Sequence, residues 1–172
     1  MQKIAIIGSG GTGKSTLARH LGDILKIPVY HLDALYWKPN WTPTPLKEWE
    51  TIQEKLVQAE SWIMDGNYSN TMRIRLQAAD TVIFLDYPTW LCFWRVLKRR
   101  WKYRGKTRPD MGEGCQEKID LQFLSWIWTY RKTRRPGILE KLEGLKNRKN
   151  ILVFNSPKQT RQFLQQLKLK TA

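Results

Sequence analysis

The chain has 172 residues, the length of one ordinary domain, and 41% of them are hydrophobic, so a single folded unit over residues 1–172 is expected. The apolar run at the start is too short for a signal peptide, and no stretch approaches the roughly 18 apolar residues of a membrane span. The two cysteines lie far apart and away from any cysteine or histidine cluster, which argues against a zinc site or a disulfide framework. These features favour a cytoplasmic protein with no membrane partner, and both a monomer and a homodimer are compatible with them.

The net charge of +15 is unevenly distributed along the chain. Residues 1–94 contain nine basic and nine acidic residues, whereas residues 95–135 carry a net charge of +9 and residues 136–172 a net charge of +6. Such an excess predicts a polyanionic partner, which is a triphosphate, a phosphorylated substrate or nucleic acid. A basic surface that only faces solvent is the alternative.

Short apolar, β-branched runs alternate with segments whose apolar residues have helical spacing. In chain order, strands are expected over residues 3–7, 28–33, 61–66, 81–86 and 150–155. Helices are expected over residues 14–25, 46–60, 70–79, 89–101, 116–131, 137–145 and 157–169. This alternation predicts an α/β fold with a parallel sheet covered by helices on both faces and ligands at the carboxyl ends of the strands.

Two of the expected helices are rich in aromatic residues. The helix that begins near residue 89 has an apolar side, and its charged residues lie elsewhere on the helix. The apolar side consists of Trp90, Phe93, Trp94, Leu97 and Trp101. The helix over residues 116–131 has an apolar stripe that predicts packing in the core. The stripe consists of Leu121, Leu124, Ile127 and Trp128, with Phe123 and Trp126 beside it.

A glycine-rich motif follows the first expected strand and opens the first expected helix. Residues 8–15 read GSGGTGKS and match the pattern GxxxxGK[ST]. Backbone N–H groups of such a loop converge with the helix N-terminus on phosphate oxygens, so we expect it to bind ATP or GTP. The lysine is expected to reach the β- and γ-phosphates, and the serine hydroxyl to bind Mg²⁺. The expected nucleotide-binding residues are Gly8, Ser9, Gly10, Gly11, Thr12, Gly13, Lys14, Ser15 and Thr16.

The motifs of GTPase switches, NKxD and DxxG, do not occur, which favours a small ATP-dependent phosphotransferase. Such enzymes work by positioning and by neutralising charge, and Lys14 is the first expected catalytic residue. For the metal ligand beside Ser15, Asp65 is preferred and Asp86 is the alternative. Asp33 ends the second expected strand, where a carboxylate can bind or deprotonate an acceptor hydroxyl; a helix cap or a salt bridge is the alternative. Neither histidine has the setting of a catalytic base.

Residues 103–114 contain three glycines and a proline and have the composition of an exposed loop that covers a site. We call residues 103–135 the lid region. Its arginines are candidates for stabilising charge on a transferred phosphoryl group, with a purely surface role as the alternative for each. The catalytic candidates are Arg104, Arg108, Arg131 and Arg135, with Arg134 in the same group. Beside Asp33, the rings of Tyr36, Trp37 and Trp41 form either a wall of the substrate site or a hydrophobic plug over the sheet.

Six segments together resemble the FlaR-like bacterial topology-modulation family, whose members are related to adenylate kinases. The segments are GSGGTGKST, HLDALYWKPNW, WIMDGNYS, VIFLDYP, RPDMGEGC and FLSWIWTYR. The resemblance covers nearly the whole chain. It implies a P-loop NTPase fold with a five-stranded parallel sheet in the order 2-3-1-4-5, and a lid.

The resemblance also bears on the acceptor site. Asp65 and Gly66 match the start of the DG motif of nucleoside monophosphate kinases. Adenylate kinases continue this motif with Phe-Pro-Arg, whereas this chain continues with NYS, and its nearest arginines are Arg73 and Arg75. Arg73 is therefore a substrate-binding candidate together with Asp33 and the nearby rings.

Two functions are compatible with these features. The first is an ATP-dependent phosphotransferase of adenylate-kinase type, with ATP and Mg²⁺ as cofactors and an unknown small molecule or nucleotide as acceptor. The second is a nucleotide-regulated nucleic-acid-binding protein that affects DNA topology, which the family name and the basic C-terminal half suggest. No helix-turn-helix, zinc-finger or OB pattern supports the second function.

Overall fold

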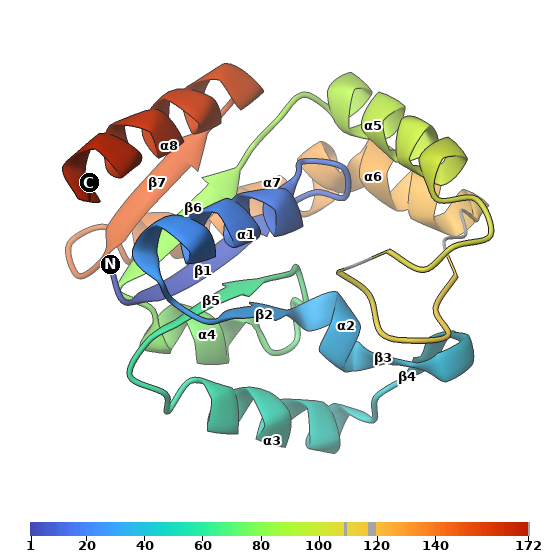
Figure 1. The fold of residues 1–172 in the computed structure, drawn as a ribbon, viewed down its shortest axis with the longest axis horizontal. Helices are drawn as coiled ribbons and strands as arrows, with labels where there is room; N and C mark the ends of the chain where they lie inside the picture. Colours follow the sequence, from blue (N-terminus) through green and yellow to red (C-terminus); the bar gives the residue numbers. More distant parts are fainter. Residues whose placement is uncertain (109, 117–119, 172) are drawn as a thin grey trace.

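The computed structural model describes residues 1–108, 110–116 and 120–171. Its centre is a five-stranded sheet in the order β2-β5-β1-β6-β7, in which all neighbouring strands are parallel (Figure 1). The strands are β1 Lys3–Gly8, β2 Val29–His31, β5 Trp62–Asp65, β6 Thr81–Leu85 and β7 Asn150–Phe154. Counted in chain order, these five strands have the expected order 2-3-1-4-5, so the prediction of an α/β P-loop NTPase fold is confirmed.

Helices follow or precede each of these strands. They are α1 Lys14–Leu25, α2 Leu32–Tyr36, α3 Leu46–Leu56, α4 Met72–Ala78, α5 Thr89–Lys102, α6 Leu121–Thr133, α7 Arg135–Glu143 and α8 Pro157–Thr171. A small hairpin of β3 Trp37–Lys38 and β4 Thr42–Pro43, with the 3₁₀ turn η1 Pro39–Trp41 between them, joins α2 to α3. Among the described residues, no helix combines the length and the apolar composition needed to cross a membrane.

The alternation of side chains along the strands divides the core between the two faces of the sheet. On β1, Ile4 and Ile6 belong to one buried cluster, which includes residues of α1, α5, α6 and α8. Ala5 and Ile7 belong to the other, which includes residues of α4 and α7. Figure 1 shows α1 and α8 on the near face of the sheet and α4 and α7 behind it. The sheet is therefore covered on both faces, and its carboxyl ends remain open for a site.

Two expected element boundaries differ from the structure. The second strand ends at His31, so Asp33 lies in the first turn of α2 and not at a strand end. The chain turns early because Leu32 is fully buried against Gly66 of the neighbouring segment. Helix α6 begins at Leu121 and not at residue 116; residues 117–119 lie outside the described part of the chain.

One aromatic helix turns its apolar side outward, and the predicted core stripe of the other is only partly buried. In α5 the buried residues are Cys92 and Val96, and the expected apolar side faces outward, with Trp90, Trp94 and Trp101 exposed. In α6 Ile127 is buried as predicted. The predicted core stripe is wrong at two positions, since Leu121 and Trp128 are exposed. Helix α5 is oriented by its contact with the glycine-rich loop, which a pattern of apolar spacing cannot reveal.

Candidate active site

The glycine-rich loop joins β1 to α1 in a conformation that requires glycine. Gly11 and Gly13 have φ angles of +80° and +91°, which residues with a side chain rarely adopt. Thr12 Oγ1 closes the loop by donating a hydrogen bond of 2.8 Å to the Ser9 carbonyl. A Cβ atom at Gly11 would collide with the carbonyl of Cys92, so α5 lies directly on the loop. The loop opens α1, and its backbone can therefore surround a phosphate group at that helix N-terminus.

Lys14 is folded over the glycine-rich loop. Its Nζ donates to the carbonyls of Gly8 and Ser9, at 2.9 Å in each case. Enclosure away from solvent lowers the pKa of Lys14, although the nearby charges of Asp33 and Asp65 oppose this shift. Lys14 is half-buried and lines the cavity, so its ammonium group can meet phosphate oxygens with less water to displace than a fully exposed lysine.

Ser15, Asp65 and His31 form a chain of hydrogen bonds at the carboxyl ends of β2 and β5. Ser15 Oγ donates to Asp65 Oδ2 at 2.8 Å, and His31 Nδ1 contacts Asp65 Oδ1. Burial alone would lower the pKa of His31, but the hydrogen bond to Asp65 and the charge of Asp65 raise it above its ordinary value. No role is predicted for His31 from the sequence, because pairing across strands β2 and β5 has no signature in the chain itself.

The donors at this position fit the expected metal ion. A serine hydroxyl and a carboxylate are hard oxygen ligands of the kind that Mg²⁺ prefers. Asp86, the alternative ligand, is held by two arginines: Arg135 Nε lies 2.7 Å from its Oδ2 and Arg131 Nε 3.7 Å from its Oδ1. The described residues contain no cluster of three or more His, Cys, Asp or Glu side chains able to hold a metal, so Ser15 and Asp65 would need phosphate and water oxygens to complete the coordination.

Asp33 faces the same cavity as the glycine-rich loop. Its Oδ1 accepts a hydrogen bond of 2.8 Å from the Tyr68 hydroxyl. Burial raises the pKa of Asp33, and the hydrogen bond from Tyr68 and the charge of Lys14 offset this only in part. A carboxylate with a raised pKa is a better proton acceptor than an ordinary one, which is the property that a general base requires.

Aromatic rings form a wall beside Asp33. Tyr36 packs against Trp49 and Tyr68, with ring centroids 5.2 and 4.6 Å apart, and Trp37 packs against Trp41 at 5.5 Å. The buried Nε1 of Trp49 has no hydrogen-bond partner among the described residues. The rings line the cavity and do not fill it, which favours the substrate wall over the hydrophobic plug.

The glycine-rich loop, Asp33 and the rings line one cavity of about 1060 Å³. A volume of this size accommodates a nucleotide together with a second small molecule. The lid region closes one side of it: Trp41 Nε1 donates to the Gln116 carbonyl at 3.0 Å, and Cys115 Sγ lies 3.3 Å from the Lys38 carbonyl. Figure 1 shows the long connection after α5 reaching across to the hairpin β3–β4.

The structure brings only some of the candidate lid arginines to the cavity. Arg108 lines it, with its Nη1 2.9 Å from Asp110 Oδ2, and Arg134 lines it as well. Arg104 is exposed and does not line the cavity. Arg131 and Arg135 are paired with Asp86, so the structure does not place them at a bound phosphate as expected.

Asp110 is a further acidic residue of the cavity that the sequence analysis does not single out. Burial would raise the pKa of Asp110, but the charge of Arg108 and the nearby Ser15 hydroxyl hold it below its ordinary value. Asp110 therefore places a charged group of the lid region near Ser15.

Two arginines of α5 line the cavity without having been predicted. Arg95 Nη1 donates to the Thr12 carbonyl at 3.2 Å, and Arg99 lies one turn further along the helix. The two arginines are four residues apart, on the side of α5 opposite the tryptophans, and this spacing is visible in the sequence as a basic side of the helix.

Arg73, the substrate-binding candidate, is exposed and does not line the cavity. Its neighbour Arg75 is buried, and its Nη1 contacts Gln53 Oε1 while its Nη2 donates to the Gly66 carbonyl at 3.4 Å. Burial lowers the pKa of Arg75 to about 10. Arg75 thus supports the segment after Asp65 from behind, and neither arginine replaces the one that adenylate kinases have in this motif.

We expect Arg75→Ala to lower the free energy of unfolding by about 3 kcal/mol, because it leaves the buried Gln53 amide without its charged partner. Arg73→Ala, on the exposed side of the same helix, is the matched control and should change it by less than about 0.5 kcal/mol. Urea denaturation of the two variants measures both values. A larger effect for Arg73→Ala than for Arg75→Ala would contradict this arrangement.

No family model and no curated protein sequence matches the chain. Solved structures of small kinases do match it over nearly its whole length. Shikimate kinase from Acinetobacter baumannii in complex with shikimate is 17% identical, with a TM-score of 0.61 and coverage of 97% of this chain and 90% of that one. Shikimate kinase from Bacteroides thetaiotaomicron is 16% identical, with a TM-score of 0.57 and coverage of 97% and 96%. A gluconokinase from Sinorhizobium meliloti is 15% identical, with a TM-score of 0.55 and coverage of 98% and 90%.

The chain has the fold of these P-loop kinases. At this level of identity the likeness concerns the fold, and the site must be judged from its own residues.

Proposed function

We propose that the protein transfers the γ-phosphoryl group of ATP to a hydroxyl group of a small molecule. The observation that carries this proposal is the position of Asp33, which faces the same cavity as Lys14 and has a pKa raised by burial. A site that only binds a nucleotide has no need for a second carboxylate beside the phosphate loop. The similarity of fold to shikimate kinases and a gluconokinase supports the same class of reaction.

In the proposed reaction, the glycine-rich loop and Lys14 bind the β- and γ-phosphates. Asp33 accepts the proton of the acceptor hydroxyl while the oxygen of that hydroxyl bonds to the γ-phosphorus. The bond between the γ-phosphorus and the oxygen that bridges it to the β-phosphate breaks at the same time, and ADP leaves. Arg95, Arg99 and Arg108 line the cavity and supply positive charge around the transferred group. Mg²⁺ held at Ser15 and Asp65 would neutralise charge on the phosphates when bound.

The surroundings of Asp33 favour an acceptor with a ring. Tyr36, Trp37 and Trp49 line the cavity there, and aromatic side chains of this kind suit a ring-shaped ligand. A nucleoside monophosphate is a poorer candidate, because neither arginine that follows Gly66 lines the cavity.

The segments around Asp33 and Gly66 lead us to infer membership of the FlaR-like family. The related idea of a nucleic-acid-binding protein that affects DNA topology gains no support from the similar structures. Part of the basic excess that suggested it faces the cavity, at Arg95, Arg99, Arg108 and Arg134.

The proposed function is tested by incubating the protein with ATP, Mg²⁺ and a panel of acceptors that contains ring polyols, hydroxy acids, nucleosides and nucleoside monophosphates. Release of ADP that depends on the acceptor, with a phosphorylated acceptor seen by mass spectrometry, is the expected result. ADP release at the same rate without any acceptor would indicate an ATPase. A phosphorylated nucleoside monophosphate as the preferred product would contradict the proposed acceptor class.

A further inference from the structure

Helix α5 turns an apolar stripe to the solvent. Trp90, Trp94 and Trp101 are 67%, 62% and 85% exposed, and Leu97 between them is 38% exposed. The spacing of four, three and four residues places all four on one side of the helix. Trp128 of α6, 63% exposed, continues the stripe through its ring contact with Phe93 at 5.9 Å. We call Trp90, Trp94, Leu97, Trp101 and Trp128 the indole face.

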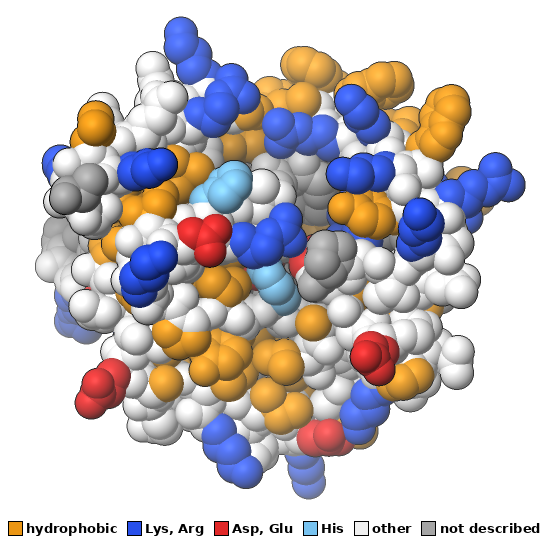
Figure 2. Space-filling view, in the orientation of Figure 1, with side chains coloured by type: hydrophobic (Ala, Val, Ile, Leu, Met, Phe, Trp, Pro, Cys, Tyr) orange, Lys and Arg blue, Asp and Glu red, His pale blue; other side chains and the backbone are white. Residues whose placement is uncertain are grey.

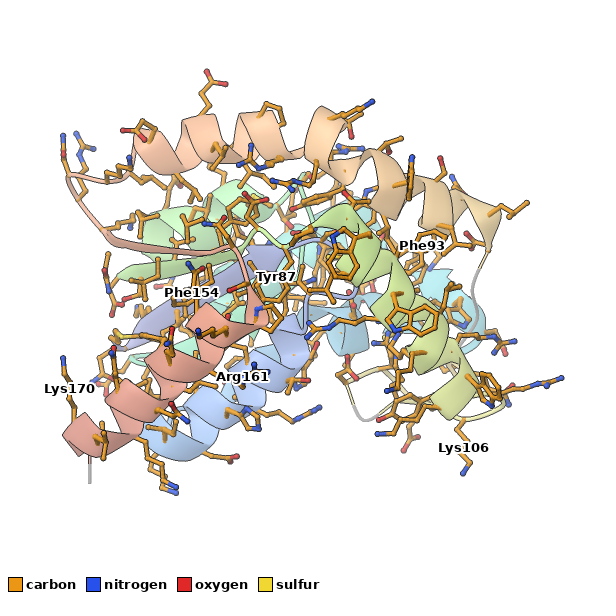
Figure 3. The ribbon with its side chains drawn as sticks, turned by 90° about the horizontal axis from the view of Figure 1, so that it is seen from above. Tyr87, Phe93, Lys106, Phe154, Arg161 and Lys170 are labelled. Atoms are coloured by element: carbon orange, nitrogen blue, oxygen red, sulfur yellow. The ribbon has the colours of Figure 1, made fainter. Side chains whose placement is uncertain are left out.

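Figure 2 shows hydrophobic side chains gathered at the upper right, over α5, with Lys and Arg side chains among them. Figure 3 shows ring side chains on the outer face of α5, between Phe93, which lies toward α6, and Lys106 just beyond the end of the helix. Exposed tryptophans at this density are unusual on a protein that stays free in water, which marks the face as a candidate interaction surface.

The charge around the indole face restricts the choice of partner. Residues 87–109 contain eight Lys and Arg residues and no Asp or Glu. Lys98 and Lys106 are exposed there, and Lys132 is exposed one turn after Trp128. A partner must therefore offer an apolar layer and negative charge at the same surface.

Two other partners fit less well. A second copy of the chain would bring two of these basic surfaces together, and their like charges would repel. Single-stranded nucleic acid stacks its bases on rings in a positively charged groove, but the indole face is the outward side of a helix and includes Leu97, which has no ring. A bilayer with anionic lipids satisfies both requirements, because tryptophan settles at the headgroup level and lysine binds the lipid phosphates.

We propose that the indole face binds the surface of an anionic membrane and holds the protein there as a peripheral protein. This differs from the expectation of no membrane partner, which rested on the absence of a spanning segment. The opposite side of α5 carries Arg95 and contacts Gly11, so a bound membrane leaves α5 between the lipid and the glycine-rich loop. The proposal does not depend on which reaction the cavity supports.

The test is sedimentation of the protein with vesicles of phosphatidylcholine, with and without phosphatidylserine. We expect binding that requires phosphatidylserine and falls as salt increases. The double variant Trp94→Ser with Trp101→Ser should weaken binding by about tenfold or more, since it removes two of the five side chains of the indole face. Lys98→Gln with Lys106→Gln should weaken it by about tenfold by removing two charges. Leu169→Ser, at an exposed apolar position among lysines on α8, is the matched control and should leave binding unchanged.

Absence of binding to phosphatidylserine vesicles, or equal binding by the tryptophan variant and the wild type, would overturn the proposal. Conversion of a dimer into a monomer by the tryptophan variant, measured by light scattering, would make the face a subunit interface instead. Loss of single-stranded DNA binding with vesicle binding retained would make it a nucleic-acid surface. All variants lie outside the cavity, and unchanged melting temperatures establish that each one is folded.

Discussion

Lys14→Ala is expected to reduce ATP turnover by at least about a hundredfold while the protein remains folded. Lys14 is the cation that lies over the glycine-rich loop, with its Nζ 2.9 Å from the carbonyls of Gly8 and Ser9. Its loss leaves the loop's backbone N–H groups in place but removes the charge that meets the β- and γ-phosphates. Both the affinity for ATP and the transfer step should therefore fall.

The free energy of unfolding, by contrast, should change little in Lys14→Ala. Enclosure of the ammonium group costs free energy, as its lowered pKa indicates, so its removal should cost little or no stability. The measurements are ATP binding by calorimetry, turnover by release of ADP, and thermal unfolding. Lys47→Ala, at an exposed position of α3, is the control for loss of a lysine. Unchanged ATP affinity in Lys14→Ala would refute the assignment of the loop.

The sheet is predictable from the sequence because its strands are short, apolar and bounded by glycine, proline or aspartate. Thr81–Leu85 is buried at every position, and so is Trp62–Asp65. A strand buried on both faces needs a continuous apolar run, and such runs stand out in the sequence. The end of β2 at His31 differs from the prediction because it depends on the burial of Leu32 against Gly66. That contact joins segments more than thirty residues apart.

The site was predictable as far as its residues belong to local motifs. The glycine-rich loop directly follows β1 and Asp65 ends β5, so the sequence locates them. The arginines are different, because each one's partner comes from another element. Arg131 and Arg135 contact Asp86, which precedes them by more than forty residues, and this pairing removes them from the cavity. Arg95 reaches the loop because α5 turns its polar side inward.

The orientation of α5 departs from the usual arrangement of an amphipathic helix. An amphipathic helix normally turns its apolar stripe to the core. In α5 the carbonyl of Cys92 lies against Gly11, so the side of the helix that carries Cys92 and Val96 faces the loop. The tryptophans are left outside, and the same rotation that exposes them brings two arginines to the cavity. The orientation of α5 thus accounts for both the arginines in the cavity and the indole face.

Asp33→Asn is expected to leave ATP binding intact and to reduce phosphoryl transfer by about a hundredfold or more. The asparagine oxygen can still accept the hydrogen bond from Tyr68, so the geometry of the wall should persist. What is lost is the group that accepts the acceptor's proton. Calorimetry with ATP and single-turnover transfer to the acceptor found in the panel measure the two effects separately.

The same variant should be at least as stable as the wild type at neutral pH. The folded protein raises the pKa of Asp33, so the protonated form is favoured by folding and the charged form is not. The contribution of Asp33 to stability is therefore greatest in acid, below the ordinary pKa of aspartate, and is lost as the pH rises through its folded value. The free energy of unfolding of Asp33→Asn, relative to wild type, should rise from acid to neutral pH.

Urea denaturation of both proteins across this pH range measures the difference. Asp23→Asn is the control, because Asp23 is exposed on α1 and its replacement should produce no comparable trend. A variant that is both inactive and less stable at neutral pH would indicate that Asp33 holds the wall together as an anion, and its proposed role as a base would fail. A residue that is kept for its chemistry retains its charge at a cost to folding. Its replacement should therefore give an inactive variant that is as stable as the wild type or more stable.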